Sequence, residues 1–438
     1  MFSYYLDLAL RSFKRSPALT ALMVLALGLG IGTSMTTLTV FHVLSGDPIP
    51  HKSKRLFYVQ LDASELGGSA PGAEPLTQLS RFDAETLLRD KRGVRQVMMT
   101  GGRVAVQPMS ASGQFDSKPF FATARYTTAD FFPMFETPLR YGHAWDANDD
   151  AASARVAVIS ESLNQRLFGG ADSTGKLLRV GSNDLRVVGV IGTWRPVPHY
   201  YDLIAGRYAD TEEVFTPFNT SLALSLPVVG SLSCWGNANS DDRHAVNASC
   251  AWIQYWVELA SPAEAAGYRQ YLVNHSEQQK AAGRYQRPPN VRLRNVNEWL
   301  DFRKVVPSDV RLQVWLAFGF LLVCLTNTVG LLLAKCLRRS PEIGVRRALG
   351  ATRRAIFTQF VVEAGAIGIA GGLLGLGLAL LGLWGVRQNP ASYAKLAQLD
   401  ASMLVTTFAL ALLASLLAGL LPAWRACLVT PALQLKSQ

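Results

Sequence analysis

Charged side chains are scarce in this chain: Asp, Glu, Lys and Arg together supply only 17% of its 438 residues. Four stretches contain none of them, and each is long enough to cross a bilayer as a helix, which takes about 20 apolar residues. They are residues 16–46, 312–334, 364–386 and 401–424. This shortage of charge predicts a multi-pass membrane protein. We expect transmembrane helices at 18–45, 312–334, 357–386 and 401–424.

The usual signs of catalysis are also missing. The six histidines are scattered without metal-ligand spacing, and no G-x-S-x-G nucleophile motif is present. One fragment, residues 170–176, matches most of an ATP-binding loop, G-x-x-x-x-G-K. That loop needs Ser or Thr after its lysine to bind Mg²⁺, and this chain has Leu177 there. We therefore expect a non-enzymatic chain with no catalytic residues and no metal site.

The surroundings of this fragment predict a turn rather than a nucleotide site. An ATP-binding loop follows a strand and opens a helix. Here the order is reversed, because residues 161–168 have helical spacing of Leu163 and Leu167, and strand-like runs flank a turn at 181–184. We expect the glycines to end a helix and lead into a β-hairpin.

Lysine and arginine cluster at one end of each apolar stretch. Short cytoplasmic loops carry an excess of these residues, which places all three clusters in the cytoplasm. The clusters are Arg11, Lys14 and Arg15; Lys335, Arg338, Arg339, Arg346, Arg347, Arg353 and Arg354; and Arg425 and Lys436. Both termini are then cytoplasmic. Residues 1–17 are predicted as an amphipathic helix on the membrane surface, and 335–356 and 425–438 as cytoplasmic segments.

The region between the first two spans, 46–311, is expected to be extracytoplasmic. Residues 47–311 hold 29 Lys and Arg against 28 Asp and Glu, so nearly all of the net charge of +11 lies elsewhere. No basic patch is left on a folded domain for nucleic acid, which excludes that partner. Strand, helix, strand patterns at 55–110 and 251–300 predict a large α+β domain, with a β-rich subdomain inserted at about 115–250.

Cysteine is rare as well. Of five cysteines, only Cys234 and Cys250 fall in the extracytoplasmic region, where disulfides form. We predict that they pair, which would close a loop and contribute roughly 3 kcal/mol. Two free thiols are the alternative.

Glycine is abundant within the first and third spans. Glycines spaced four apart allow helices to approach closely, so we predict packing positions there. They are Gly28, Gly32, Gly368, Gly371, Gly372 and Gly375. The spacing fits packing between helices of one subunit and packing between two subunits equally well. Glu363 is the one acidic residue inside the third hydrophobic stretch, and we expect it to pair with a nearby arginine or to reach the membrane surface. An intramembrane proton relay is the alternative.

A short helix is predicted between the second and third spans. Pro341 is placed to start it and Gly350 to stop it, and Val345, Ala348 and Leu349 give it a small apolar face. Such a helix with basic flanks either lies on the membrane or inserts into a groove of a partner.

This segment carries a family resemblance. The run RRSPEIGVRRALGATRRAIFTQFVVEA resembles the signature of the FtsX-type permease domain of ABC transporters, and GLLPAWRACLVTPALQL resembles the end of that domain. The runs DFFPMFETPLRYGHAW and ARVAVISESLNQRLFGGADSTGKLLRVGSNDLRVVGVIG resemble the periplasmic core domain of MacB-like permeases. The family usually has a basic or polar residue before E-I-G, where this chain has Pro341.

The resemblance implies a mechanism and a set of partners. The chain would be a permease in the bacterial inner membrane, its large domain periplasmic and porter-like at 55–110 and 251–300. It would pair with a second permease subunit, as a homodimer or heterodimer, and bind a separate ATPase subunit, because no ATPase domain is recognised in these residues. ATP and Mg²⁺ would be used by that partner, with no cofactor bound here. The residues implied in coupling are Glu342, Ile343, Gly344, Arg346, Arg347 and Gly350.

In this mechanism, ATP hydrolysis moves the periplasmic domains and drives export across the cell envelope without substrate crossing between the spans. A periplasmic adaptor and an outer-membrane duct are further partners that the resemblance implies. Two alternatives are a permease that extracts lipoproteins and a regulatory scaffold that activates cell-wall hydrolases. The large external region favours export.

Overall fold

The computed structural model describes residues 13–66, 72–108, 118–236, 242–388 and 401–427. Most of the predicted amphipathic helix, 1–17, and most of the predicted tail, 425–438, lie outside these residues. The chain divides into two compact units, one built from residues up to 46 and from 306 onward, and the other from 47–305. We call them the helical bundle and the extramembrane domain.

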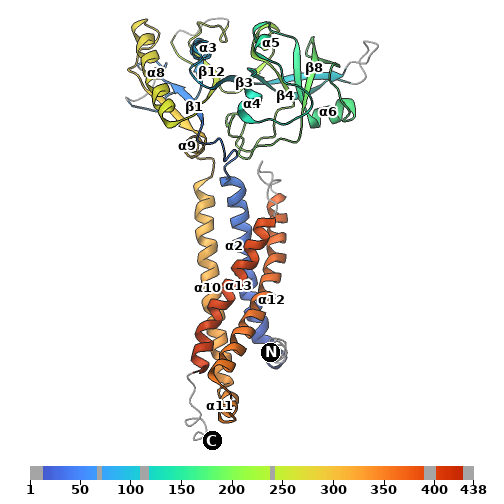
Figure 1. Ribbon diagram of the computed structural model, residues 1–438, viewed down its shortest axis with the longest axis vertical. Helices are drawn as coiled ribbons and strands as arrows, with labels where there is room; N and C mark the ends of the chain where they lie inside the picture. Colours follow the sequence, from blue (N-terminus) through green and yellow to red (C-terminus); the bar gives the residue numbers. More distant parts are fainter. Residues whose placement is uncertain (1–12, 67–71, 109–117, 237–241, 389–400, 428–438) are drawn as a thin grey trace. The chain divides into compact units, whose positions relative to one another are not determined.

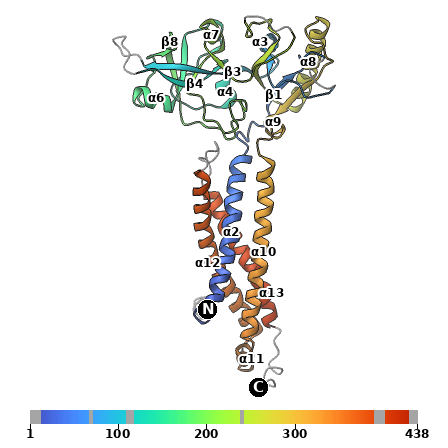
Figure 2. The same ribbon diagram turned by 180° about the vertical axis from the view of Figure 1, so that it is seen from behind.

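The helical bundle consists of α2 (Pro17–Ser45), α10 (Ser308–Arg338), α12 (Arg353–Arg387) and α13 (Ala401–Cys427), with the short α11 (Ser340–Ala348) between α10 and α12. Among the described helices, these four long ones have the length and apolar composition needed to cross a membrane. They lie side by side in both views (Figures 1 and 2). The sides facing inward bury Leu27, Ile31, Leu321 and Ile367, whereas Trp315, Leu381 and Trp384 are exposed on the outside, as expected for contact with lipid.

All six predicted packing glycines face another helix of the same chain. A Cβ atom on Gly28 would lie 2.8 Å from Leu374, and one on Gly32 would lie 2.8 Å from Leu378, so α2 and α12 are in close contact. On α12, Gly371 faces Leu27 and Gly375 faces Ile31 and the Gly28 carbonyl, while Gly368 and Gly372 face Ser415 and Ala411 of α13. The absence of side chains at these positions allows the helices to approach closely.

In its described residues, the extramembrane domain forms one 13-stranded sheet, with the main order β13-β1-β12-β3-β4-β9-β6-β8-β5. Its strands are β1 (Leu56–Leu61), β2 (Leu79–Ser80), β3 (Arg95–Pro108), β4 (Phe120–Thr127), β5 (Leu139–Gly142), β6 (Val156–Ser160), β7 (Leu177–Val180), β8 (Asn183–Ile191), β9 (Val214–Pro217), β10 (Val228–Val229), β11 (Ser233–Cys234), β12 (Cys250–Glu258) and β13 (Val291–Asn295). Its helices are α3 (Arg81–Asp90), α4 (Phe131–Phe135), α5 (Ala147–Ala151), α6 (Glu161–Phe168), α7 (Phe218–Ala223), α8 (Pro262–Ala281) and α9 (Val296–Phe302).

The early and late parts of this domain pair in the same sheet. Strand β1 lies between β12 and β13, and every residue of β12 is buried, which explains its run of aromatic and aliphatic side chains. The 14-residue strand β3 pairs with β12 from Arg95 to Met99 and with β4 from Met99 to Val106. The region predicted as an inserted subdomain therefore continues the same sheet through β3 and β4.

The G-x-x-x-x-G-K fragment forms a turn, as the sequence predicts. Helix α6 ends at Gly169, whose φ of 68° is in the left-handed region, and β7 and β8 then form an antiparallel hairpin. A strand follows Lys176, so no helix N-terminus faces this loop. The predicted pair of strand, helix, strand patterns is also present, as β1, α3 and β3 and as β12, α8 and β13.

Candidate coupling site on the short helix of the bundle

The short helix α11 occupies one end of the bundle, between α10 and α12 (Figure 1). It runs from Ser340 to Ala348, with Pro341 in its first turn, where the missing N–H of proline has no cost. Gly350 follows with φ of 100°, a conformation that favours glycine, and the Thr352 hydroxyl then caps α12 by accepting from the Ala355 amide. The sequence signals for starting and stopping this helix are therefore confirmed.

One side of α11 packs against the bundle. Ile343 is 6% exposed and belongs to a cluster with Cys336 of α10, Ile356 and Phe360 of α12, and Ala423 of α13. Gly344 is also buried. Burial of Ile343 contributes about 1.5–3 kcal/mol to the attachment of the helix.

Ion pairs also join α11 to its neighbours. Glu342 lies 2.7 Å from Arg346 one turn later, 3.5 Å from Arg339 at the end of α10, and 3.6 Å from Arg15 before α2. Arg346 also donates to Gln359 of α12, at 3.2 Å. Glu342 and Arg346, both predicted coupling residues, thus have partners within the chain.

A buried ion pair extends this network into the bundle. Glu363 of α12 is 1% exposed and lies 2.5 Å from Lys335 of α10, which is 4% exposed. Arg339 is 3.5 Å from the second oxygen of Glu363. The predicted pairing of Glu363 with a nearby arginine is present, and the structure adds Lys335. From the sequence, Lys335 and Arg339 are assigned only to the basic cluster between the second and third spans. No sequence signal indicates that both side chains pair with Glu363.

The outward side of α11 is apolar. Pro341, Val345 and Leu349 are spaced four apart, which places them on one face, and all three are exposed. Val345 is 54% exposed and Leu349, which caps the helix, is 83% exposed. Val345 and Leu349 were not among the predicted coupling residues, although their helical spacing was visible in the sequence. Arg347 is partly exposed, and Gly350 is exposed.

In the extramembrane domain, Cys234 and Cys250 form a disulfide between β11 and β12. The two cysteines are opposite each other in the antiparallel register. The bond holds the short strand β11 against the end of the buried strand β12.

A buried charge cluster lies near the centre of the sheet. The guanidinium of Arg125 in β4 pairs with Asp202, at 2.5 Å, and with Glu212, and all three residues are less than 5% exposed. Tyr201 donates to Glu212 at 2.8 Å, and Gln254 donates to Asp202 at 2.9 Å. Burial alone would raise the pKa of Asp202, but the positive charge of Arg125 holds it below its usual value.

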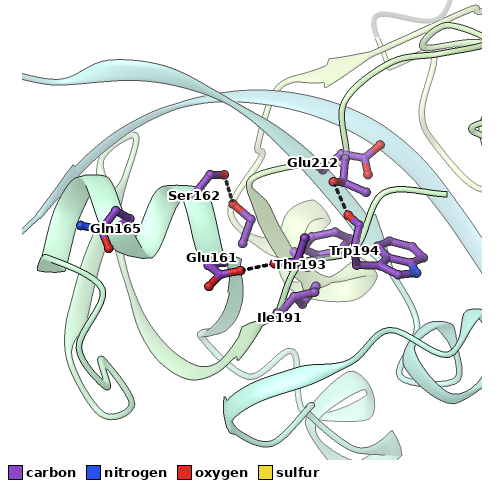
Figure 3. A pocket seen from close by; sticks show the side chains of 11 residues that line it. Glu161, Ser162, Gln165, Ile191, Thr193, Trp194 and Glu212 are labelled. Carbon is purple, nitrogen blue, oxygen red and sulfur yellow. Dashed lines mark hydrogen bonds between the residues drawn. The ribbon is translucent and has the colours of Figure 1, made fainter. Parts of the chain in front are cut away.

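A pocket of about 440 Å³ lies beside this cluster (Figure 3). Glu161 at the start of α6 points to Thr193, which donates to it at 2.7 Å, and it also pairs with Arg140. Glu212, on another wall, is bonded to Arg125 and Tyr201. Because both carboxylates lining the pocket already have partners inside the domain, the geometry favours a structural role for them.

Comparison with known proteins gives two family matches. Residues 20–273 match the MacB-like periplasmic core domain, and residues 314–431 match the FtsX-like permease C-terminal domain. The first match covers more than half of the chain.

The chain is 24% identical over 436 residues to the macrolide export ATP-binding/permease protein MacB of Azoarcus sp. (strain BH72), covering 98% of this chain and 59% of that protein. The chain therefore spans about three fifths of the length of this relative. It is 24% identical over 332 residues to the uncharacterized ABC transporter permease YknZ of Bacillus subtilis (strain 168), covering 75% of this chain and 72% of that one.

Among solved structures, the periplasmic region of MacB from Actinobacillus actinomycetemcomitans aligns with a TM-score of 0.37 and 13% identity, covering 59% of this chain and 96% of that one. The two family matches follow one another along the sequence, and the second includes most of α10 together with α12 and α13. The chain therefore belongs to the MacB-like, FtsX-type family of ABC transporter permeases.

Proposed function

We propose that this chain is the permease subunit of an exporter and that it transmits the work of a separate ATPase subunit to its periplasmic domain. The observation that carries the proposal is the two-sided character of α11. Its outward face presents Val345 and Leu349, while its inner face is joined to α10 and α12 by Ile343 and by the ion pairs of Glu342. An exposed apolar helix face suits insertion into the groove of a partner.

In this mechanism the ATPase binds α11 through its apolar face. Burying Val345 and Leu349 would contribute roughly 1.5–3 kcal/mol for each side chain. Glu342, Arg346 and Arg347 orient the helix, and Gly344 and Gly350 allow its close packing and its exit turn. The ATPase uses ATP and Mg²⁺, and this chain binds neither.

Movement of α11 then reaches the periplasm through α10. The Arg339 side chain links α11 to Glu363 and to the last turn of α10, so a shift of α11 changes the position of that helix. The other end of α10 continues in sequence into the extramembrane domain. Two permease subunits in the inner membrane, each with cytoplasmic termini, would act together with a periplasmic adaptor and an outer-membrane duct.

The test begins with affinity purification of the tagged chain from native membranes in mild detergent, followed by an ATPase assay. The variant Leu349→Asp places a charge on the proposed docking face, and we expect it to reduce the retained ATPase activity about tenfold or more. Leu66→Asp is the matched control, because Leu66 is 68% exposed in the extramembrane domain.

Equal ATPase retention by the native chain, Leu349→Asp and Leu66→Asp would show that α11 is not the docking site. Absence of any ATPase from all three preparations would contradict the proposed function itself. Recovery of an adaptor with the native chain supports export, whereas recovery of a cell-wall hydrolase would favour a regulatory scaffold instead.

A further inference from the structure

A larger cleft, of about 890 Å³, opens in the extramembrane domain between α3 on one side and α5 and α7 on the other. Figure 1 shows α3 and α5 on the same side of the sheet. Arg95, Gln96 and Met98 at the start of β3 also line the cleft and form its floor. The volume is within the range of about 300–1,000 Å³ typical of sites for small molecules. None of the lining residues belongs to the buried Arg125 cluster or to the bundle.

The cleft has an apolar interior. Phe82 and Leu88 lie on α3, Met98 on β3, and Phe218 on α7, and Val246 comes from the loop before the disulfide. Leu88 and Val246 are partly exposed, so water covers apolar surface in the empty cleft. Covering this surface with an apolar ligand would be favourable by about 25 cal/mol for each Å² buried.

The α3 wall is basic. Arg89 lies on α3 and Lys91 caps it, and Arg95 follows at the start of β3, against one carboxylate, Glu85. Glu85 pairs with Arg81 at 2.6 Å, and Arg95 pairs with Glu258 at 2.8 Å. Within the described part of the chain, Arg89 and Lys91 have no carboxylate partner, and Arg89 reaches only the Thr86 hydroxyl, at 3.3 Å. Two cations at the mouth of the cleft are therefore free to bind an anionic group.

The acidic side chains are Asp130, which precedes α4 and is bonded to the floor, and Asp150, on the opposite wall in α5. Asp130 accepts from the Gln96 amide at 3.0 Å, and Asp150 accepts from the Ala129 amide at 2.7 Å and from the Trp145 indole at 2.9 Å. All these donors are neutral. Among the described residues, neither carboxylate forms an ion pair with a lysine or an arginine, so this part of the cleft is suited to a cationic group.

We propose that this cleft binds short apolar peptides with both termini free. The terminal ammonium lies against Asp130 and Asp150, and the terminal carboxylate lies against Arg89 and Lys91. The apolar side chains between the termini cover the partly exposed Phe82, Leu88 and Val246. Peptides combine two opposite charges with an apolar middle, which matches the order of groups across the cleft.

The pKa of Asp150 is consistent with this assignment. Burial raises it to about 6, and the like charges of Asp130 and Asp149 add to the shift, although the hydrogen bonds from Ala129 and Trp145 oppose it. The carboxylate is therefore largely ionised at neutral pH and lacks a cation. A bound ammonium would supply one.

The test is calorimetric titration of the full chain in lipid nanodiscs with tri- to pentapeptides of leucine and alanine, and with empty nanodiscs as the blank. No ATPase or nucleotide is present, so the outcome does not depend on the proposed function. We expect peptides with free termini to bind. Acetylation of the amine or amidation of the carboxylate should each weaken Kd about tenfold or more, because each removes one charge-assisted contact.

Variants assign each end of the peptide to a wall. The double variant Arg89→Gln and Lys91→Gln should lose the preference for a free carboxylate, and Asp150→Asn should lose the preference for a free amine. Lys176→Gln, a lysine outside the cleft, is the control and should keep both preferences. Arg89 and Lys91 are exposed, so their replacement leaves the fold intact even if the Asp150 variant unfolds. Equal affinity for free and blocked peptides, or no binding at all, would overturn the proposal.

Discussion

The carboxylate of Glu363 lies 2.5 Å from the ammonium of Lys335, and both side chains are buried inside the helical bundle. The two residues belong to different helices, α12 and α10, and Arg339 links the same carboxylate to Glu342 on α11. A buried ion pair of this kind adds little net stability over apolar side chains, but breaking it is costly because a buried charge is left alone.

Removing one member of this pair should therefore destabilise the bundle more than removing both. We expect Glu363→Gln to lower the free energy of unfolding by about 3–5 kcal/mol, and the double variant Lys335→Met and Glu363→Leu to recover most of the loss. Thermal unfolding of the purified chain in detergent, followed by tryptophan fluorescence, measures both. A double variant as unstable as the single one would show that the charges themselves are needed.

The buried arginine of the extramembrane domain gives a second prediction. Arg125→Met leaves Asp202 and Glu212 without their cation, and we expect a loss of about 3–5 kcal/mol in stability at neutral pH. Arg103→Met is the control, because Arg103 is exposed and stacks only over Phe121, so its loss should cost less than about 0.5 kcal/mol.

The stability lost in Arg125→Met should also depend on pH, and the direction of this dependence follows from the pKa of Asp202. In the native chain the pKa of Asp202 is lowered, so its contribution to stability is present above the unfolded pKa and is lost as the pH falls. Without Arg125, burial would instead raise the pKa of Asp202, and protonation of this carboxylate would stabilise the variant. The stability difference between native chain and Arg125→Met should therefore shrink between about pH 7 and pH 4.5. A difference that is constant or grows on acidification contradicts this account.

Helix packing can be tested with two glycines of α12. A Cβ atom on Gly375 would lie 3.0 Å from Ile31 and 3.1 Å from the Gly28 carbonyl, whereas one on Gly377 would meet nothing within 4 Å. We expect Gly375→Ala to destabilise the bundle by about 1–3 kcal/mol. Gly377→Ala should be neutral or slightly stabilising, because alanine favours helix more than glycine. Thermal unfolding in detergent compares the two, and equal effects would argue against close contact between α2 and α12.

Peptide binding in the cleft should weaken in acid. A terminal amine has a pKa of about 8 and a terminal carboxylate one of about 3.5, so neither changes charge between about pH 7 and pH 5. Asp150, with a pKa raised to about 6, becomes protonated in this range and loses its attraction for the ammonium. The negative charges of Asp130, which also lines the cleft, and of Asp149 contribute to the raised pKa of Asp150.

We therefore expect Kd to rise about tenfold over that interval, measured by titration calorimetry. Asp150→Asn should bind weakly at both pH values, with a nearly flat profile. A native chain whose affinity does not change with pH would show that Asp150 does not contact the ligand.

Much of the architecture could be read from local sequence. The four uncharged runs are long enough to span a bilayer, Pro341 and Gly350 set the limits of α11, and Gly169 ends α6 before the β7–β8 hairpin. These signals are reliable because each depends on a few neighbouring residues: hydrocarbon excludes unpaired charge, proline fixes φ, and glycine permits positive φ.

The tertiary structure decided how distant residues meet. Only the packing of α11 shows that Glu342 and Arg346 face the bundle while Val345 and Leu349 face outward. The pairs Glu363 with Lys335 and Arg125 with Asp202 join residues far apart in the sequence. The cleft likewise takes its basic side chains from the end of α3 and its acidic ones from α5 and the residue before α4. The amino-acid sequence alone determined the helices, strands and turns, because each is caused by neighbouring residues. Ion pairs and the exposure of side chains depend instead on which helices and strands pack together. The same local sequence pattern is compatible with many such arrangements, so the tertiary packing is needed to decide between them.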